Sequence, residues 1–312
     1  MRIAIMGAGG LGAYVGARLA AAGEDVAFIA RGAHLEAMRQ QGLAVESPYG
    51  DLHIASPVST DDPAEIGPVD IVLFTVKLWD TESAASTLHP LVAAGTRVVT
   101  LQNGIESVDL IAKHVPRTHV LAGVSYIPAL VGRPGVIVNP GGSKRLFVDR
   151  DRGNPAVAAF AAACSRSIGL EIELPEAIGT VLWRKFVGVS AFSAATTLMR
   201  STAGPIRTNP EAREFLRQLV VEGSAVAAAT GNDLGAAFAD EMLAFYDTFP
   251  AEQRSSMAED LEKGRRLELP WLSGRIHELG VRYGVPTPAH SAAFRALSLY
   301  VDGRRAGSLP PH

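Results

Sequence analysis

MRIAIMGAGGLGAYVGARLAAAGEDVAFIAR, residues Met1 to Arg31, predicts a strand, a glycine turn, a helix and a second strand. Arg2–Met6 is a short apolar run of the size of a buried parallel strand. Gly7-Ala8-Gly9-Gly10-Leu11-Gly12 follows it with the spacing G-x-G-x-x-G, and good helix formers come next. Asp25–Ala30 is apolar again. Because the motif follows a strand, opens a helix and leads to a second strand, it indicates a dinucleotide-binding unit.

The glycines of this turn have separate expected roles. Gly7 permits the tight turn, Gly9 lets the backbone approach a pyrophosphate, and Gly12 lets the helix pack closely on the strand. A diphosphate at the N-terminus of the helix would meet free N–H groups and the positive end of the helix dipole. We therefore expect Gly7, Gly9, Gly10, Leu11 and Gly12 to bind the cofactor. The alternative is a structural turn that binds nothing.

The end of the second strand indicates which dinucleotide binds. A site for NAD usually has Asp or Glu there, bonded to the ribose 2′-hydroxyl. This strand ends in Ala30-Arg31-Gly32, without an acid. A guanidinium is a planar, permanent cation suited to a 2′-phosphate. The sequence therefore predicts NADP(H) with Arg31 on the 2′-phosphate, and the alternative is a solvated surface arginine.

Composition and charge limit the possible function classes. The chain has 312 residues, 47% hydrophobic and 20% charged, which is typical of a globular protein large enough for two domains. Its formal net charge of -3 does not indicate binding to nucleic acid or to a membrane surface. The single cysteine, Cys164, excludes an internal disulfide, and no Cys/His cluster has metal-ligand spacing, so we expect no metal. We find no targeting segment or transmembrane pattern, and a cytoplasmic location is the default expectation.

Strands and helices continue to alternate after Arg31. Asp70–Val76 and Thr96–Leu101 are apolar runs typical of buried parallel strands. Lys77 directly follows the first run, and Asn103 lies just beyond the second. Ligands of doubly wound sheets bind outside the carboxyl ends of the strands. We therefore expect Lys77 and Asn103 to join the glycine turn and Arg31 in the cofactor site.

Two further patterns complete the first half of the chain. Glu82–Val92, between the two buried runs, is predicted to form a helix. Val120–Ile127, Val136–Asn139 and Arg145–Val148 resemble strands joined by Gly/Pro turns, which indicates an antiparallel extension of the sheet.

Strand signals fade after Pro175, and long helical patterns follow. We predict an α/β Rossmann-like N-terminal domain, residues 1–174, with a mostly parallel sheet and an antiparallel extension. An all-α C-terminal domain, residues 175–312, would bind the substrate. The Ala-rich helix expected over Glu211–Thr230 is either core or the face of a possible homodimer.

A nicotinamide enzyme that reduces a carbonyl needs a proton donor for the alkoxide that forms. In Leu182-Trp183-Arg184-Lys185-Phe186, a lysine stands among apolar residues early in the first long helical pattern. A half-buried lysine can have a lowered pKa and act as an acid. Taken alone, this stretch favours an ordinary surface lysine.

Several stretches, from Met1 to about Ala296, match one known family in order and spacing. They are the GAGGLG turn, Ala30-Arg31-Gly32, Val76-Lys77, Gln102-Asn103-Gly104, Leu182-Trp183-Arg184-Lys185, Ser255-Ser256-Met257, Asp260-Leu261-Glu262-Lys263-Gly264 and Glu268. Together they resemble the ketopantoate reductase family (2-dehydropantoate 2-reductases), although no single piece is specific. The resemblance implies an oxidoreductase that uses NADPH to reduce ketopantoate, a 2-oxo acid, to D-pantoate in pantothenate biosynthesis.

The resemblance also implies roles for individual residues. Lys185 resembles the lysine that donates the proton, and Glu268 the glutamate that contacts the substrate hydroxyl and supports that lysine. Ser256 resembles a contact to the substrate carboxylate, and Asn103 the asparagine beside nicotinamide and substrate. The alternatives are a solvated helix charge for Glu268 and an N-cap residue for Ser256, since serine is a favoured cap. In the cofactor half, Arg31 and Lys77 resemble cofactor contacts.

The chain departs from the family pattern on the substrate side. Four and eight positions after Lys185, where the family usually carries asparagines, it has Val189 and Ser193. Losing the partner of a buried substrate hydroxyl costs about 1–3 kcal/mol. After Glu268 the family commonly reads Ile-Asp-Tyr-Leu-Asn-Gly, and this chain reads Leu-Pro-Trp-Leu-Ser-Gly, with Pro270 and Trp271.

These departures leave several functions open. The leading hypothesis is NADPH-dependent reduction of a 2-oxo acid to a D-2-hydroxy acid, with ketopantoate the first candidate. A different, bulkier or less polar 2-oxo acid is the alternative, unless Ser190 or Ser193 substitutes for the missing amide. A non-catalytic NADP-binding sensor and a dehydrogenase acting on an amine or imine are further alternatives.

Overall fold

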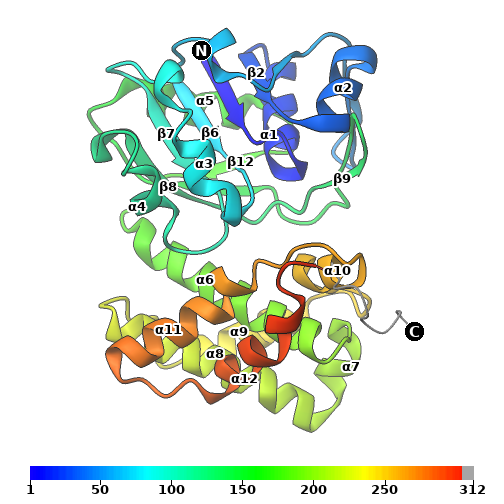
Figure 1. Ribbon diagram of the computed structural model, residues 1–312, viewed down its shortest axis with the longest axis vertical. Coiled ribbons are helices and arrows are strands. Elements are labelled where there is room, and N and C mark those ends of the chain that lie inside the picture. The colour runs from blue at the N-terminus through cyan, green and yellow to red at the C-terminus, as the bar shows by residue number, and fades with distance from the viewer. Residues whose placement is uncertain (304–312) are drawn as a thin grey trace. The chain divides into compact units, whose positions relative to one another are not determined.

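The structure is a computed structural model that describes residues 1–303. It divides into two compact units, residues 1–178 and a second unit that begins at Gly179 (Figure 1). The first unit contains the sheets, and the second is helical, as the strand and helix patterns predict.

The first unit is built on an eight-stranded sheet. In spatial order its strands are β12 (Glu171–Glu173), β11 (Arg145–Val148), β8 (Val120–Ser125), β7 (Arg97–Thr100), β6 (Ile71–Phe74), β1 (Arg2–Met6), β2 (Asp25–Ile29) and β5 (Val58–Thr60). All pairs from β8 to β5 are parallel, and β11 runs antiparallel to β8. β12 pairs parallel with β11. The predicted mostly parallel sheet with an antiparallel extension is confirmed.

A second sheet of four strands corrects one part of the prediction. Its order is β4 (Leu52–Ile54), β3 (Leu43–Glu46), β10 (Val136–Val138) and β9 (Leu130–Arg133). The strand expected at Val136–Asn139 therefore does not extend the main sheet, because it pairs in parallel with β3. Burial explains this choice, since Ile137 packs with Leu43 and Val45 in one apolar cluster.

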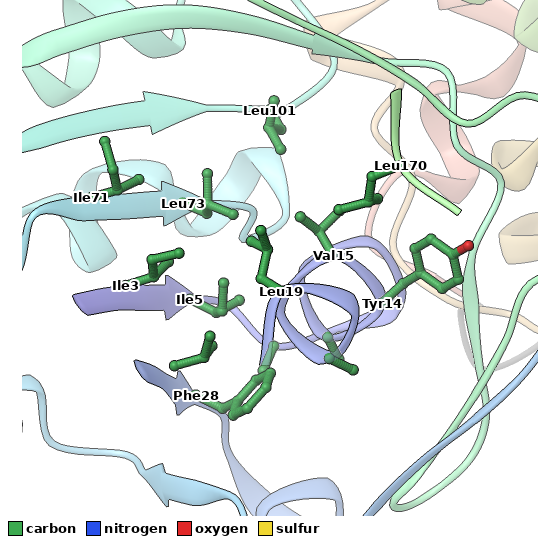
Figure 2. Packing of buried hydrophobic residues seen from close by; sticks show 14 of the residues in the cluster. Ile3, Ile5, Tyr14, Val15, Leu19, Phe28, Ile71, Leu73, Leu101 and Leu170 are labelled. Atoms are coloured by element: carbon green, nitrogen blue, oxygen red, sulfur yellow. The ribbon is translucent and has the colours of Figure 1, made fainter. Parts of the chain in front are cut away.

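The alternating side chains of β1 supply both faces of the main sheet. Ile3 and Ile5 join a cluster with α1, α5 and the second sheet, whereas Ala4 and Met6 join a cluster on the opposite face. Figure 2 shows the first cluster, in which Tyr14, Val15 and Leu19 of α1 lie beside side chains of the strands. The strand residues are Ile3, Ile5, Phe28, Ile71 and Leu73. Both faces of the parallel sheet are thus covered, as in doubly wound folds.

The helices of the first unit are short apart from three. The longer ones are α1 (Gly10–Ala21), α2 (Gly32–Gln41) and α5 (Pro155–Arg166). The others are α3 (Thr81–Ala85), α4 (Ser107–Ile111) and the 3-10 helices Pro63–Glu65, Leu78–Asp80, His89–Leu91 and Arg117–His119. The helix predicted over Glu82–Val92 is wrong in its second half. Pro90 lacks the N–H that a continuing α-helix needs, and a 3-10 turn replaces it.

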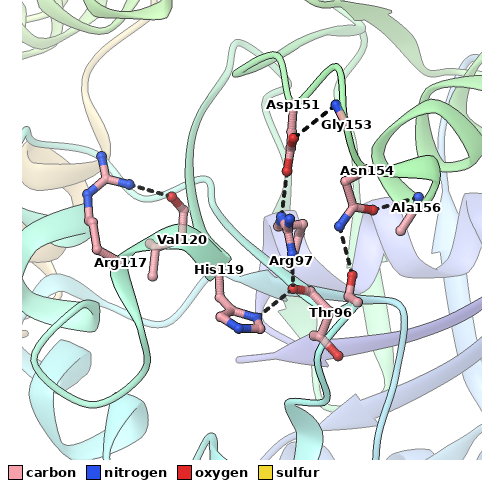
Figure 3. Close-up of polar contacts among 10 residues, drawn as sticks. Thr96, Arg97, Arg117, His119, Val120, Asp151, Gly153, Asn154 and Ala156 are labelled. Carbon is pink, nitrogen blue, oxygen red and sulfur yellow. Dashed lines mark hydrogen bonds and ion pairs between the residues drawn. The ribbon is translucent and has the colours of Figure 1, made fainter.

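Polar contacts hold the loop before α5 against the start of β7 (Figure 3). Arg97 Nε lies 2.6 Å from Asp151 Oδ2. Asn154 caps α5 through the N–H of Ala156 and donates to the Gly95 carbonyl at 2.9 Å. This network lies at the amino end of β7, so it serves stability at the edge of the sheet opposite to the carboxyl ends.

The second unit consists of helices. They are α6 (Ile178–Leu198), α7 (Ala203–Thr208), α8 (Pro210–Ala229), α9 (Phe238–Asp247), α10 (Ser256–Glu262), α11 (Ser273–Tyr283), α12 (Pro288–Leu297) and the 3-10 helices Leu269–Trp271 and Ser298–Tyr300. The apolar face of α8 packs in the core of this chain, since its residues Leu216, Leu219, Val220 and Val226 are buried. Within residues 1–303, no helix is long and apolar enough to cross a membrane.

Candidate active site

The glycine turn has the backbone that its motif predicts. Gly7 has φ +93°, a conformation that favours glycine, and a side chain there would meet Val76 at 2.7 Å. At Gly12 an added Cβ would lie 2.5 Å from the Gly7 carbonyl oxygen. At Gly10 it would lie 2.4 Å from the Ala129 carbonyl oxygen. These three glycines are therefore required by close packing inside the protein.

Gly9 differs from the other glycines of the turn. It is the N-cap of α1, is exposed, and has no atom within 4 Å of an added Cβ. No side chain caps the helix, so the first N–H groups of α1 receive no capping bond from a side chain. This open, uncapped N-terminus is the feature of the turn that packing does not explain.

Thr75 holds the turn in place, and sequence reasoning missed it. Its hydroxyl lies 2.7 Å from the Gly7 carbonyl oxygen and donates a hydrogen bond to it. Thr75 follows β6, so the bond connects the end of one strand to the turn after its neighbour β1. A threonine just beyond an apolar strand carries no signal in the sequence that distinguishes this role.

Arg31 lies where β2 passes into α2. It is exposed and is the N-cap residue of α2, but its side chain makes no capping bond. The described residues give its guanidinium no hydrogen bond or ion pair. The cation at the end of β2 is therefore available to an anionic ligand.

The loops after β6 and β7 are tied together by Gln102. Its buried amide Nε2 donates to the Val76 carbonyl at 2.9 Å and to Thr81 Oγ1 at 2.9 Å. Lys77 and Asn103 directly adjoin these bonded residues in sequence, and Lys77 Nζ lies 5.5 Å from the centre of the Trp79 ring. The structure thus brings together the loops of two predicted cofactor residues, and Gln102 is the link that sequence reasoning did not assign.

The second unit contains Lys185 and Glu268. Lys185 is part-exposed on α6, and Glu268 is buried and precedes the 3-10 turn at Leu269–Trp271. Desolvation lowers the pKa of Lys185 to about 8, and the negative charge of Glu268 acts in the opposite direction. An ordinary surface lysine would keep a pKa near 10.4. Glu268 is therefore not a solvated helix charge, and Lys185 differs from an ordinary surface lysine in its lowered pKa.

Helix geometry separates the candidate substrate residues of α6. At 100° per residue, Val189 lies about 40° and Ser193 about 80° from Lys185 around the axis, whereas Ser190 lies about 140° away. Ser190 is fully buried and its hydroxyl has no hydrogen-bond partner. Ser193, which is also buried, therefore lies nearer than Ser190 to the face of α6 that carries Lys185.

The N-cap alternative for Ser256 is wrong. Ser255 is the N-cap of α10, and its hydroxyl accepts a hydrogen bond from the N–H of Ala258 at 3.1 Å. Ser256 is the first helical residue and is exposed, which leaves its hydroxyl without a capping role. Nearby in sequence, Arg266 lies 5.8 Å from the centre of the Trp271 ring.

Comparisons with known proteins cover almost the whole chain. Residues 3–150 match the family model described as ketopantoate reductase PanE/ApbA, and residues 177–301 match its C-terminal counterpart. A 2-dehydropantoate 2-reductase of Archaeoglobus fulgidus is 34% identical over 285 residues, 91% of this chain and 92% of that protein.

Solved structures agree in fold. A PanE/ApbA family ketopantoate reductase from Ralstonia eutropha JMP134 superposes with a TM-score of 0.88 at 31% identity, covering 96% of this chain and 98% of that one. A D-mandelate dehydrogenase solved with NADH and anilino(oxo)acetate has a TM-score of 0.87 at 24% identity, covering 96% and 98%, and shows likeness of fold alone.

Proposed function

The chain belongs to the ketopantoate reductase family of oxidoreductases, and from this premise we propose that it uses NADPH to reduce a 2-oxo acid to a D-2-hydroxy acid. The observation that carries the proposal is Lys185 with its pKa lowered to about 8 beside the charge of Glu268. Such a lysine is an acid that can work near neutral pH. Steady-state assays with NADPH and a panel of 2-oxo acids test the proposal, and turnover of none of them would contradict it.

The cofactor would be held by the first unit. The uncapped N-terminus of α1 at Gly9 and the adjoining Gly10 and Leu11 fit the diphosphate, Arg31 the 2′-phosphate, and Lys77 a further cofactor contact. The nicotinamide held there would supply the hydride that reduces the carbonyl. Asn103 would orient the substrate beside it.

The second unit would supply the proton and the substrate contacts. The Lys185 ammonium donates its proton to the carbonyl oxygen, which prevents a full negative charge from forming there. Glu268 accepts a hydrogen bond from a substrate hydroxyl and favours the protonated form of Lys185. Ser256 donates to the substrate carboxylate. We further propose a cytoplasmic enzyme that forms a homodimer.

Glu268 should shift the pH at which activity declines. Only protonated Lys185 can donate, so kcat falls as the pH rises through a pKa of about 8. Because Glu268 raises the pKa of Lys185, Glu268→Gln should move this alkaline limb to lower pH. The kcat–pH profiles of both proteins measure the shift. An unmoved or upward-shifted limb would contradict the coupling.

Val189 makes the identity of the 2-oxo acid testable. Val189→Asn places an amide one turn from Lys185, where it can bond the ketopantoate hydroxyl. A regained hydrogen bond of about 1–3 kcal/mol predicts a gain of about five- to 150-fold in kcat/KM for ketopantoate. The matched control is 3,3-dimethyl-2-oxobutanoate, which lacks only that hydroxyl and should gain nothing.

The same two substrates separate the alternatives for the native enzyme. A wild-type preference for ketopantoate over its deoxy analogue would show that the hydroxyl is bonded without the missing amide, by Glu268 as proposed or by Ser193 as well. A preference for the analogue would favour a less polar physiological substrate, which is the hypothesis suggested by Val189 in place of an asparagine. NADPH binding without turnover of any 2-oxo acid would favour the non-catalytic sensor.

A further inference from the structure

Buried hydroxyl groups connect the start of α10 to the middle of α6. Thr196 Oγ1 and Ser255 Oγ lie 2.8 Å apart, although 59 positions separate them in the chain. Thr196 is fully buried and Ser255 is 8% exposed, so water does not compete for this bond. The contact lies entirely within the second unit.

The neighbouring bonds give this chain of hydroxyls one direction. Thr196 Oγ1 donates to the Phe192 carbonyl at 2.8 Å, and this uses its only proton. Ser255 must therefore donate to Thr196, while its oxygen accepts the N–H of Ala258 at 3.1 Å. Each hydroxyl donates once and accepts once, so the N-terminus of α10 is held in one arrangement against α6.

Thr196 shares a helix face with the proposed proton donor. It comes eleven residues after Lys185 in α6, which is three turns and about 20° around the axis. Three turns are about 16 Å, too far for Thr196 itself to touch a small substrate at the Lys185 ammonium. Thr196 can therefore affect the substrate only indirectly, through its hydrogen bond to Ser255. Ser255 directly precedes Ser256, the exposed first residue of α10.

We propose that Thr196 is a positioning residue that fixes Ser256, through Ser255, relative to the face of α6 that carries Lys185. The inference deepens the proposed function and rests on it, because Ser256 is taken as the contact to the carboxylate of the 2-oxo acid. A carboxylate anchor contributes equally to the bound substrate and to the transition state. Its loss therefore raises KM and leaves kcat unchanged.

Thr197 provides a matched control in the same helix. It is as buried as its neighbour, 1% exposed, and its hydroxyl has no hydrogen-bond partner. Thr196→Val and Thr197→Val are the same chemical change at adjacent residues, and only the first removes the link to α10. Thr196→Ser keeps the hydroxyl and should restore the wild-type behaviour.

The experiment is steady-state kinetics with the best 2-oxo acid substrate and NADPH. Thr196→Val should raise KM for the 2-oxo acid about tenfold, with kcat and the KM for NADPH within twofold of wild type. Thr196→Ser and Thr197→Val should both resemble wild type. In a Ser256→Ala background, Thr196→Val should add nothing further to KM, because both changes remove one anchor.

Several results would overturn the inference. An unchanged KM in Thr196→Val, or equal effects of Thr196→Val and Thr197→Val, would leave Thr196 a residue of stability alone. Should Thr196→Val not fold, Ser255→Gly breaks the same link at an N-cap, a position where glycine is well tolerated, and must raise KM likewise. Turnover of no 2-oxo acid by the wild-type protein would refute the proposed function and the inference together, whereas turnover with an unchanged KM refutes the inference alone.

Discussion

Lys185→Ala is expected to lower kcat by about a hundred- to ten-thousand-fold, the usual contribution of a general acid. The ammonium is the only group we assign to donate the proton, and Ala leaves the forming alkoxide without a donor. Binding of NADPH should be unchanged, since the residues proposed to hold it lie in the other unit. Single-turnover rates and NADPH affinity, measured by fluorescence, test both parts.

Two controls make the Lys185 result specific. Lys113→Ala removes an exposed lysine whose Nζ lies 2.7 Å from Glu82 Oε1, and a surface pair of this kind contributes little. Lys185→Arg keeps the positive charge but not the acidity, because a guanidinium retains its proton at any accessible pH. Lys185→Arg should therefore be almost as slow as Lys185→Ala. Activity of Lys185→Ala within a few-fold of wild type would refute proton donation by Lys185.

Arg31→Ala should weaken NADPH binding about ten- to a hundredfold and leave NADH binding nearly unchanged. A charged hydrogen bond to the 2′-phosphate is worth about 1.5–3 kcal/mol, and NADH has no phosphate there. The substitution should not unfold α2, since the Arg31 side chain makes no capping bond. Dissociation constants for both cofactors, measured at one ionic strength, give the selectivity ratio.

Arg39 provides the control for this measurement. It lies in the last turn of the same helix, where its Nε donates to the Ser59 carbonyl at 3.2 Å. Arg39→Ala removes the same charge from α2 away from the end of β2, so the NADPH-to-NADH ratio should stay as in wild type. Equal losses for both cofactors in Arg31→Ala would contradict the 2′-phosphate role.

Local patterns were sufficient to predict most of the first unit. The glycine spacing required a positive φ at Gly7 and room for close packing at Gly12, and the structure has both. The prediction was wrong where partners in space decided the outcome. Val136–Asn139 is a strand as its composition indicates, but only packing against Leu43 and Val45 assigns it to the second sheet.

In the candidate site too, the sequence predicted some features and only the tertiary structure decided others. The resemblance located Lys185 and Glu268, and a reading of residues alone favoured a surface lysine. Only the folded chain places the carboxylate close enough to act on the lysine and removes enough water to lower its pKa. Thr75 and Gln102 also escaped prediction, because each acts through a carbonyl far away in the sequence.

By itself, then, the sequence determined the order of strands and helices, the glycine turn and the absence of an acid after β2. These features depend on residues within one or two turns of each other, so local sterics and periodicity specify them. The tertiary structure alone decided the pKa of Lys185, the second sheet and the Thr196–Ser255 bond. Each of these depends on groups brought together from distant parts of the chain, and burial makes their charges and hydrogen bonds strong.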